Sequence, residues 1–585
     1  MKRIYASLIL LSLGCIAAQA QKFNPRIEVT NAYEGKVVDA RKTDLSVNIP
    51  DSLTNFSYKI DYSVFDNPYK GSYEFRPYQI EMKPTERRSQ RNSLFVNAGV
   101  GYTFHPEAQV VWSPVMKKNN FGFSIYDSFN GYMGPYNRQF YTLDDTSYLT
   151  TVDRNGEKYS GWLLDNDFGI NTAWYSDKVK FTADLGWDFI NSADTLTSRI
   201  FNNVRLKTRL SSAAPSRHGY YFNGALNVNA AMDDLTFGKR GTDVREIGGD
   251  VAFTLGKSLS KKNAVEADLG FQIAAYAGML ESYAVKISVT PKYIFEGNRF
   301  LAHLGAKFSY VTSADDAFLV TSLYENNITK PFFVAPEVRL RFSIIPQKLF
   351  IYADATGGVD INTYSSLVAR NPYSNAYFTK AYNAVCDNSN EKYNVIAGFK
   401  GNIATCLQWD ICAGIASHGN ALLDALALVI DDDGAELYPY WTYADYNEKF
   451  AQVSLDWKSD HVDAAAKARY SITDLAERQT RAIYPSQMTG DIAVTYNYQH
   501  RLFVGVNCSA ASSRKGLLYL PGYSVDFDAI TPGWVDLGAS ARFKFNNIFT
   551  FWLKAGNLLG QNVQRYFMHS EKGIWVTAGV TLNIQ

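Results

Sequence analysis

Apolar and polar residues alternate along much of the chain with a period of two. Near the C-terminus, every second residue is apolar and the residues between are mostly small or polar; the apolar set is Ile574, Val576, Ala578, Val580, Leu582 and Ile584. Successive side chains of a β-strand point to opposite faces of the sheet. The pattern therefore predicts a strand with one apolar face and one polar face.

The same alternation recurs upstream in segments 179–189, 332–344, 462–470 and 534–545. A half-buried strand of a soluble protein rarely keeps this pattern for so many residues. From residue 92 onward we count about 22 such strands, with about 16 to 20 as the alternative. Backbone groups in lipid must pair with one another, and a closed barrel is the sheet that achieves this. We therefore expect an all-β, transmembrane antiparallel β-barrel.

The predicted connections between strands alternate in length. Short links are expected at 176–177, 296–298, 346–347, 459–460, 498–500 and 546–547, and long ones at 131–161, 313–330, 360–390, 418–445, 473–486 and 512–533. Outer-membrane barrels have short periplasmic turns and longer extracellular loops. The alternation of short and long links therefore predicts a protein of the cell outer membrane, surrounded by membrane lipid, with both termini in the periplasm.

The N-terminus carries the features of a secretory signal. The basic Met1–Arg3 precedes an apolar run from Ile4 to Ala17, and Ala18 and Ala20 suit signal peptidase. A lipidated Cys15 is the alternative, although Ser12 fits that motif poorly. We therefore divide the chain into a signal peptide (1–20), an extended periplasmic or lumenal segment (21–91) and the barrel (92–585).

Composition supports this division and excludes some partners. Aromatic residues make up 15% of the chain, with 39 Tyr and 36 Phe, as expected for the aromatic girdles of a membrane barrel. No stretch after residue 20 approaches the roughly 18 apolar residues of a membrane helix. A net charge of +1 argues against a nucleic-acid partner.

Basic residues are prominent among the positions predicted to face the lumen. The set comprises Arg339, Arg341, Lys400, Lys467, Arg469, Arg542 and Lys544, against fewer acids such as Glu337, Asp463, Asp491 and Asp536. Basic rings favour anions in pores. A network of ion pairs across the lumen explains the same residues equally well.

Segment 21–91 is rich in proline and aromatic residues. Its prolines favour an extended peptide, and a secreted chain with many exposed aromatics is expected to bury them against something. The candidate anchors for a groove on another envelope or periplasmic protein are Tyr58, Tyr62, Phe65, Tyr69, Tyr73, Phe75 and Tyr78. The alternative is that this segment fills the lumen.

The chemistry of an enzyme is not evident. The seven histidines are scattered, and no arrangement of nucleophile and base stands out. We predict no catalytic residue, cofactor or metal. Asp431–Gly434 resembles a calcium loop only loosely, so solvated acids are the simpler interpretation. Nearby aromatics fit either glycan stacking or an interfacial girdle: Tyr438, Tyr440, Trp441, Tyr443 and Tyr446.

Two short motifs give a family resemblance. Phe551–Leu559 followed by Tyr566 resembles the penultimate strand of TonB-dependent receptors, and Arg26–Thr30 resembles the segment that opens their energy-coupling box or plug. The general character of the sequence, including its cleavage site, resembles that of outer-membrane proteins of the Bacteroidota. The resemblance implies a receptor-type barrel, but 21–91 is too short for the usual folded plug.

These observations leave three functions open. The first is a barrel without a plug that serves as a passive conduit or as a membrane-embedded partner of envelope proteins. The second is an accessory subunit of an outer-membrane assembly or uptake complex. The third is a degenerate TonB-dependent receptor for nutrient uptake. A small solute or a glycan is the expected ligand if the barrel transports one.

Overall fold

The computed structural model describes most of the chain from residue 93 onward. The described residues are 93–114, 120–137, 140–143, 149–152, 158–193, 197–212, 219–237, 240–313, 331–346, 348–373, 386–403, 406–431, 434–475, 482–520, 523–567 and 569–584. None of the helices among them is long and apolar enough to cross a membrane.

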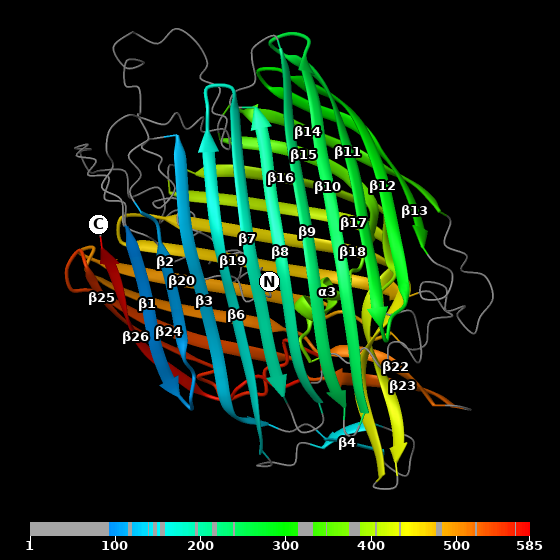
Figure 1. Cartoon of the computed structure of the whole chain (residues 1–585), viewed down its shortest axis with the longest axis vertical. Helices are drawn as coiled ribbons and strands as arrows, with labels where there is room; N and C mark the ends of the chain where they lie inside the picture. The colour runs from blue at the N-terminus through cyan, green and yellow to red at the C-terminus, as the bar shows by residue number, and fades with distance from the viewer. Residues whose placement is uncertain are drawn as a thin grey trace, which may run out of the picture. The chain divides into compact units, whose positions relative to one another are not determined.

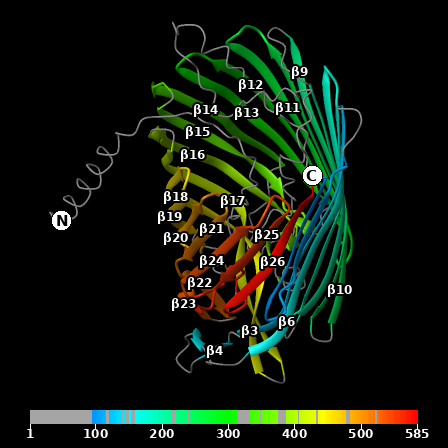
Figure 2. The ribbon, with the colours of Figure 1, turned by 90° about the vertical axis from the view of Figure 1, so that its left-hand side faces the viewer.

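One antiparallel sheet of 22 strands dominates the structure (Figures 1 and 2). Its first eleven strands are β1 (Leu94–Tyr102), β2 (Glu107–Trp112), β3 (Phe121–Asn137), β6 (Lys158–Tyr175), β7 (Val179–Ala193), β8 (Thr197–Ser212), β9 (Tyr220–Phe237), β10 (Arg240–Ser258), β11 (Asn263–Gly278), β12 (Ser282–Glu296) and β13 (Phe300–Ser313). The remaining eleven are β14 (Phe332–Ile345), β15 (Leu349–Ile361), β16 (Asn388–Ile403), β17 (Leu407–Asp431), β18 (Gly434–Lys458), β19 (Val462–Leu475), β20 (Met488–Tyr498), β21 (Leu502–Ala511), β24 (Trp534–Lys544), β25 (Phe549–Gly556) and β26 (Trp575–Ile584).

The sheet closes on itself, because β1 pairs with β26 from Leu94↔Ile584 to Tyr102↔Val576. The closure confirms the predicted antiparallel barrel and its strand number. It also removes the free sheet edges, whose unpaired N–H and C=O groups lipid could not satisfy.

Alternation along the strands separates an apolar outer face from a polar inner face. On β10, Ile247, Val251 and Leu255 are 68%, 42% and 47% exposed, whereas Glu246 on the opposite face is 2% exposed. Large exposed apolar side chains at every second position recur on most strands. Such a surface is unfavourable in water and favourable in lipid, so it identifies the outer face as the membrane surface.

The two ends of the barrel differ. At one end, called here the short-turn end, turns such as those between β6 and β7 and between β12 and β13 connect the strands. At the other, called the long-loop end, lie the β15–β16 and β25–β26 connections and the hairpins β4 (Phe140–Leu143) with β5 (Leu149–Val152), and β22 (Arg514–Leu520) with β23 (Tyr523–Thr531). β1 starts and β26 ends at the short-turn end, where Ser93 N–H donates to Ile584 O at 2.7 Å.

The prediction of a long loop at 418–445 was wrong. β17 and β18 continue through it as paired 25-residue strands, with pairs as far as Asp431↔Gly434. At about 3.4 Å per residue, strands of this length are longer than the membrane is thick, so both continue beyond it. In the same way, β3 and the β4–β5 hairpin occupy much of the predicted loop 131–161, and β22 and β23 occupy that at 512–533.

Candidate functional site

The connection between β15 and β16 folds into the barrel instead of projecting from it. We call residues 362–373 the strap; they contain the helix α3 (Tyr364–Arg370), seen within the barrel in Figure 1. Thr363 caps the helix, its hydroxyl accepting a hydrogen bond from Ser366 N–H. The strap lies in the region predicted as the loop 360–390, but its inward course was not predicted.

A buried ion pair on the barrel wall anchors the strap. Arg199 on β8 and Asp233 on β9 pair at 3.1 Å, with 1% and 0% of their side chains exposed. The Tyr364 hydroxyl donates to the same carboxylate at 2.5 Å, and Arg199 Nη1 donates to Pro372 O at 2.6 Å. The guanidinium and Asp233 Oδ2 are therefore partnered by each other and by the strap, as buried charges require, while Asp233 Oδ1 is buried without a hydrogen-bond partner among the described residues.

A second anchor lies on β10. The Glu246 carboxylate accepts hydrogen bonds from the Ser365 hydroxyl at 2.7 Å and from Ser365 N–H at 3.1 Å. Asn229 on β9 donates to the same carboxylate at 2.7 Å. Hydrogen bonds to charged acceptors are stronger than neutral ones, so α3 is held against this wall at two points.

The other side of the strap contacts the β25–β26 connection. Tyr373 stacks on His569 with ring centroids 3.4 Å apart and also contacts Tyr566 edge-on at 5.6 Å. Burial lowers the pKa of His569 to about 3, which keeps this imidazole neutral and suited to stacking. The strap thus links the β8–β10 wall to the connection that leads into β26.

The C-terminal base of the β15–β16 connection is fixed by Asp387. Asn420 Nδ2 donates to the Asp387 carboxylate at 2.9 Å, and Asp387 N–H donates to the Tyr443 hydroxyl at 3.0 Å. Asn420 forms a bulge in β17 with a φ of 51°, a conformation that asparagine tolerates better than most residues. Burial raises the pKa of Asp387 to about 6, although the hydrogen bonds from Asn420 and Asn388 oppose the shift.

An apolar core inside the barrel completes this half of the lumen. It joins strap residues to inner-face residues of several strands, and its members include Ile190, Phe201, Ala231, Val244, Ala274, Tyr276, Leu280, Ala284, Ile361, Tyr364, Leu367, Val368, Cys386, Leu422 and Trp441. Burial of this apolar surface stabilises the inward course of the strap.

A cavity of about 680 Å³ lies beside the strap. Arg370 and Asn371 of the strap line it together with β17–β20, β24 and the β25–β26 connection. Its charged lining residues are Arg370, Lys467, Arg469, Arg514 and Arg565 on the basic side and Asp424, Glu448 and Asp491 on the acidic side. The volume lies within the range of small-molecule sites.

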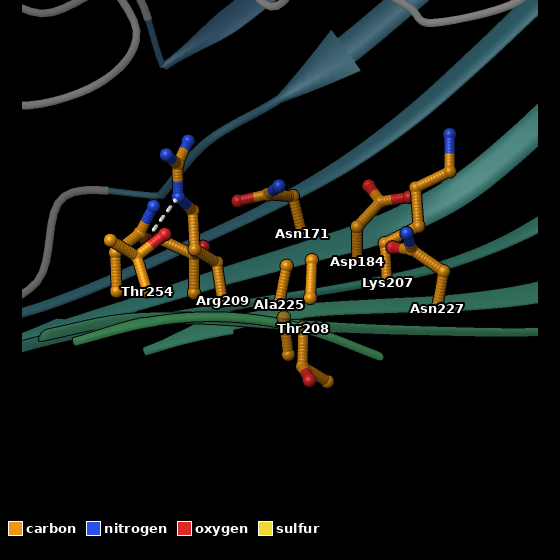
Figure 3. Close-up of a pocket in the computed structure, with 12 residues that line it drawn as sticks. Asn171, Asp184, Lys207, Thr208, Arg209, Ala225, Asn227 and Thr254 are labelled. Carbon is orange, nitrogen blue, oxygen red and sulfur yellow. Dashed lines mark hydrogen bonds between the residues drawn. The ribbon is translucent and has the colours of Figure 1, made fainter. Parts of the chain in front are cut away.

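Toward the short-turn end, the inner wall of β6–β10 is polar and exposed. A cavity of about 420 Å³ is lined there by residues that include Asn171, Asp184, Lys207, Arg209 and Asn227. In Figure 3 these five side chains project to one side of the strands, and Thr208 points to the other. Arg209 donates to Asn223 at 3.0 Å.

A buried charge cluster separates the two regions of this wall. Arg205 on β8 pairs with Asp188 and, at 2.5 Å, with Asp167. Tyr126 on β3 bonds to both Asp184 and Arg205. One guanidinium therefore connects four neighbouring strands.

The predicted lumen-facing basic residues fall on several strands, and most have local partners. Arg469 pairs with Glu448 at 2.7 Å, Arg339 with Asp354 at 3.7 Å, and Lys400 with Asp410 at 3.8 Å. Arg542 and Arg341 lie over the rings of Phe503 and Phe350. Lys467 and Arg469 line the larger cavity, whereas Lys544 does not. Their role in attracting anions remains a prediction.

Other predicted sites lie outside the described residues. These are the docking aromatics of segment 21–91, the signal peptide, Arg26–Thr30 and the acids Asp432 and Asp433. Of the aromatics considered for glycan stacking, Tyr440 and Trp441 are buried at 2% and 0% exposure, and Trp441 belongs to the apolar core beside the strap. In the described part of the chain, no group of acids, histidines and cysteines could hold a metal ion.

Sequence reasoning missed the anchors Arg199, Asp233 and Glu246. Each occupies an inward position on an alternating strand, where a wet lumen would accept any charged residue. No local signal separates a charge that holds an inward segment from one that faces water.

The residues behind the family resemblance have structural roles. Asn557 ends β25 with a φ of 48°, and its side chain bonds to Gln561 O and Gln561 N–H. Tyr566 lines the larger cavity and contacts Tyr373. Asn557 thus precedes the turn at 558–559, which leads into the wall of the larger cavity.

A closed 22-stranded barrel with an apolar outer face and a charged interior defines the chain as an outer-membrane β-barrel protein. Comparison with solved structures places its fold among transporters and receptors. The FrpB iron transporter from Neisseria meningitidis (apoprotein form) is similar at a TM-score of 0.61 and 10% identity, covering 84% of this chain and 81% of that chain.

Two further structures give the same result. The copper transporter OprC is similar at a TM-score of 0.57 and 11% identity, over 86% of this chain and 82% of that chain. The alcaligin outer-membrane receptor FauA from Bordetella pertussis is similar at a TM-score of 0.54 and 11% identity, over 86% of this chain and 78% of that chain. No protein-family model and no curated protein matches the chain. The likeness is therefore one of fold: the chain shares its large closed barrel with these transporters and receptors.

Proposed function

We propose that this protein takes up a small solute across the outer membrane, with the strap as a restriction inside the barrel. The long-loop end would face the outside, and both ends of the barrel chain would face the periplasm. The observation that carries the proposal is the strap itself, which joins the β8–β10 wall to the β25–β26 connection through Tyr364, Ser365 and Tyr373.

This arrangement favours a receptor-like uptake barrel over an open passive conduit. The strap and its apolar core lie inside the barrel toward the long-loop end, where they reduce the space that an open conduit would fill with water. Proteins of similar fold include an iron transporter, a copper transporter and an alcaligin receptor. Among the three functions left open by the sequence, a degenerate receptor for nutrient uptake fits best.

Channel recordings on the purified full-length protein test the proposal. Replacement of 364–371 by glycine and serine residues of equal number should raise single-channel conductance several-fold, because the restriction is removed. Cells with this variant should also become more sensitive to large antibiotics such as vancomycin. Ser366→Ala, on the exposed side of α3, is the matched control and should leave both measurements unchanged. Equal conductance with and without the strap sequence would rule out the restriction.

A further inference from the structure

Most of the charged side chains that line the cavity beside the strap are already paired. Two of its three lining acids are already neutralised: Asp424 pairs with Arg514 at 2.7 Å, and Glu448 pairs with Arg469 at 2.7 Å. Arg565 is held by carboxylates outside the lining, Asp536 at 2.5 Å and Glu571 at 2.9 Å. Three arginines are therefore fixed in position before any ligand arrives.

The remaining lining charges are two cations and one acid. Arg370, Lys467 and Asp491 have no ion-pair partner among the residues that the structure describes, although Lys467 and Asp491 are opposite each other in the β19–β20 register. Among these three lining side chains the cations therefore outnumber the acid by one. Arg370 comes from the strap and Lys467 from the barrel wall, so a ligand bound by both would connect the two.

The aromatic residues give the cavity an apolar side. The guanidinium of Arg565 lies 5.1 Å from the ring centroid of Trp534, and that of Arg514 lies 5.9 Å from that of Phe567. Leu423, Ile483 and Phe567 are buried around the same cavity. Apolar walls with a few well-placed polar groups are typical of small-molecule sites.

We propose that this cavity binds a small organic anion, with its carboxylate or phosphate group held by Arg370 and Lys467 and its apolar body against Trp534 and Phe567. This inference deepens the proposed function by naming the class of solute. An uncharged solute, such as a sugar, would form no ion pair with Arg370 or Lys467 and would gain little from their charge.

Equilibrium dialysis with the purified full-length protein in detergent tests the proposal. The probes are 2-naphthoate and 2-naphthyl phosphate, with the neutral 2-naphthamide of similar shape as the comparison. We expect the anions to bind at least tenfold more tightly than the amide, because each charge-assisted hydrogen bond favours the anion. Equal affinity for naphthoate and naphthamide would overturn the assignment.

Variants locate the binding site. Lys467→Gln and Arg370→Gln should each weaken naphthoate binding about tenfold and leave naphthamide unaffected. Lys207→Gln makes the same change in the smaller cavity and should leave binding unchanged. A loss of binding in Lys207→Gln equal to that in Lys467→Gln would mean that overall lumen charge, not this cavity, attracts the anion.

The binding assay does not depend on transport. Anion binding together with unchanged conductance after replacement of 364–371 would retain this site and overturn the proposed restriction. Increased conductance in that variant, with no preference for the anionic probes in the unaltered protein, would retain the restriction and overturn the anion site.

Discussion

Two regions of the same barrel wall, formed by β6–β10, have opposite character. Toward the long-loop end, Arg199, Asp233 and Glu246 are buried beneath the strap and its apolar core. Toward the short-turn end, Lys207 and Arg209 are exposed along an open polar cavity. Both regions alternate with the same period and present the same kind of apolar face to lipid.

The difference shows that alternation determines which way a side chain points but not what it meets. A charge facing inward can be solvated, as Lys207 is, or can hold a segment of the chain across the lumen, as Glu246 does. The outer face has one environment, the membrane, whereas the inner face has several.

The largest difference between the regions should appear when arginine is introduced on the inner face. Ala274, in the apolar core, is 0% exposed, whereas Ala252 is exposed and lines the smaller cavity. Ala274→Arg should destabilise the protein by about 5 kcal/mol, because it overpacks the core and buries an unpaired charge. Ala252→Arg should stay within about 0.5 kcal/mol of the original stability. The thermal midpoint of heat-modifiable gel migration measures both, and equal midpoints would remove the distinction between the two halves.

Removal of an existing arginine should show the same contrast. Arg199→Ala leaves Asp233 buried without its ion-pair partner and should cost about 3–5 kcal/mol. Arg209→Ala removes an exposed side chain that bonds to Asn223 and should cost about 0.5 kcal/mol or less. Denaturant unfolding of both variants measures the costs. A small effect of Arg199→Ala would mean that the strap contributes little to the fold.

The outer face should disfavour a charge toward both ends of the barrel, and most strongly near the membrane midplane. Val251→Arg places a cation in lipid and should cost about 2–4 kcal/mol near the midplane. Ala252→Arg, one residue along the same strand, is its matched control because it points to the lumen. Refolding into lipid vesicles compares the two, and an equal cost would contradict the assignment of the inner and outer faces.

The smallest effect should be a response of the strap to pH. Asn362, at the start of the strap, donates to Asp387 O from its backbone N–H at 3.0 Å and from its side chain at 2.9 Å. Because burial raises the pKa of Asp387 to about 6, the folded state favours the protonated carboxyl. The stabilisation is complete below about pH 4 and is lost as the pH rises through about 6. Amides in 362–373 should therefore exchange with deuterium more slowly at pH 4 than at pH 7, after correction for intrinsic rates.

Asp387→Asn serves as the comparison for this pH effect. It removes the titrating group, so protection of the strap should become independent of pH across this window. Pronounced pH dependence that persists in the variant would assign the effect to another group.

Much of the barrel could be predicted from the sequence, because each strand of a membrane barrel carries its alternation of apolar and polar residues within its own segment. The alternation of Val576, Val580 and Ile584 with small or polar residues was enough to predict β26, and similar segments led to the correct strand number. The extension of β17 and β18 was missed, since beyond the membrane the pattern no longer has to follow lipid.

The strap could not be predicted, because its contacts join residues distant in sequence. Ser365 bonds to Glu246 119 positions away, and Tyr364 bonds to Asp233 131 positions away. The sequence around Tyr364 indicates a short helix at best, and it carries no information on the side of the barrel wall to which that helix binds.

Thiol labelling tests most directly whether the strap closes one half of the lumen and leaves the other open. In a variant whose native cysteines are replaced by alanine, Ala252→Cys and Ala274→Cys introduce matched thiols on the inner face. A maleimide reagent should label Ala252→Cys rapidly in the folded barrel, and Ala274→Cys only after heat unfolding or after replacement of 364–371. Labelling of both positions at the same rate in the folded protein would contradict the account.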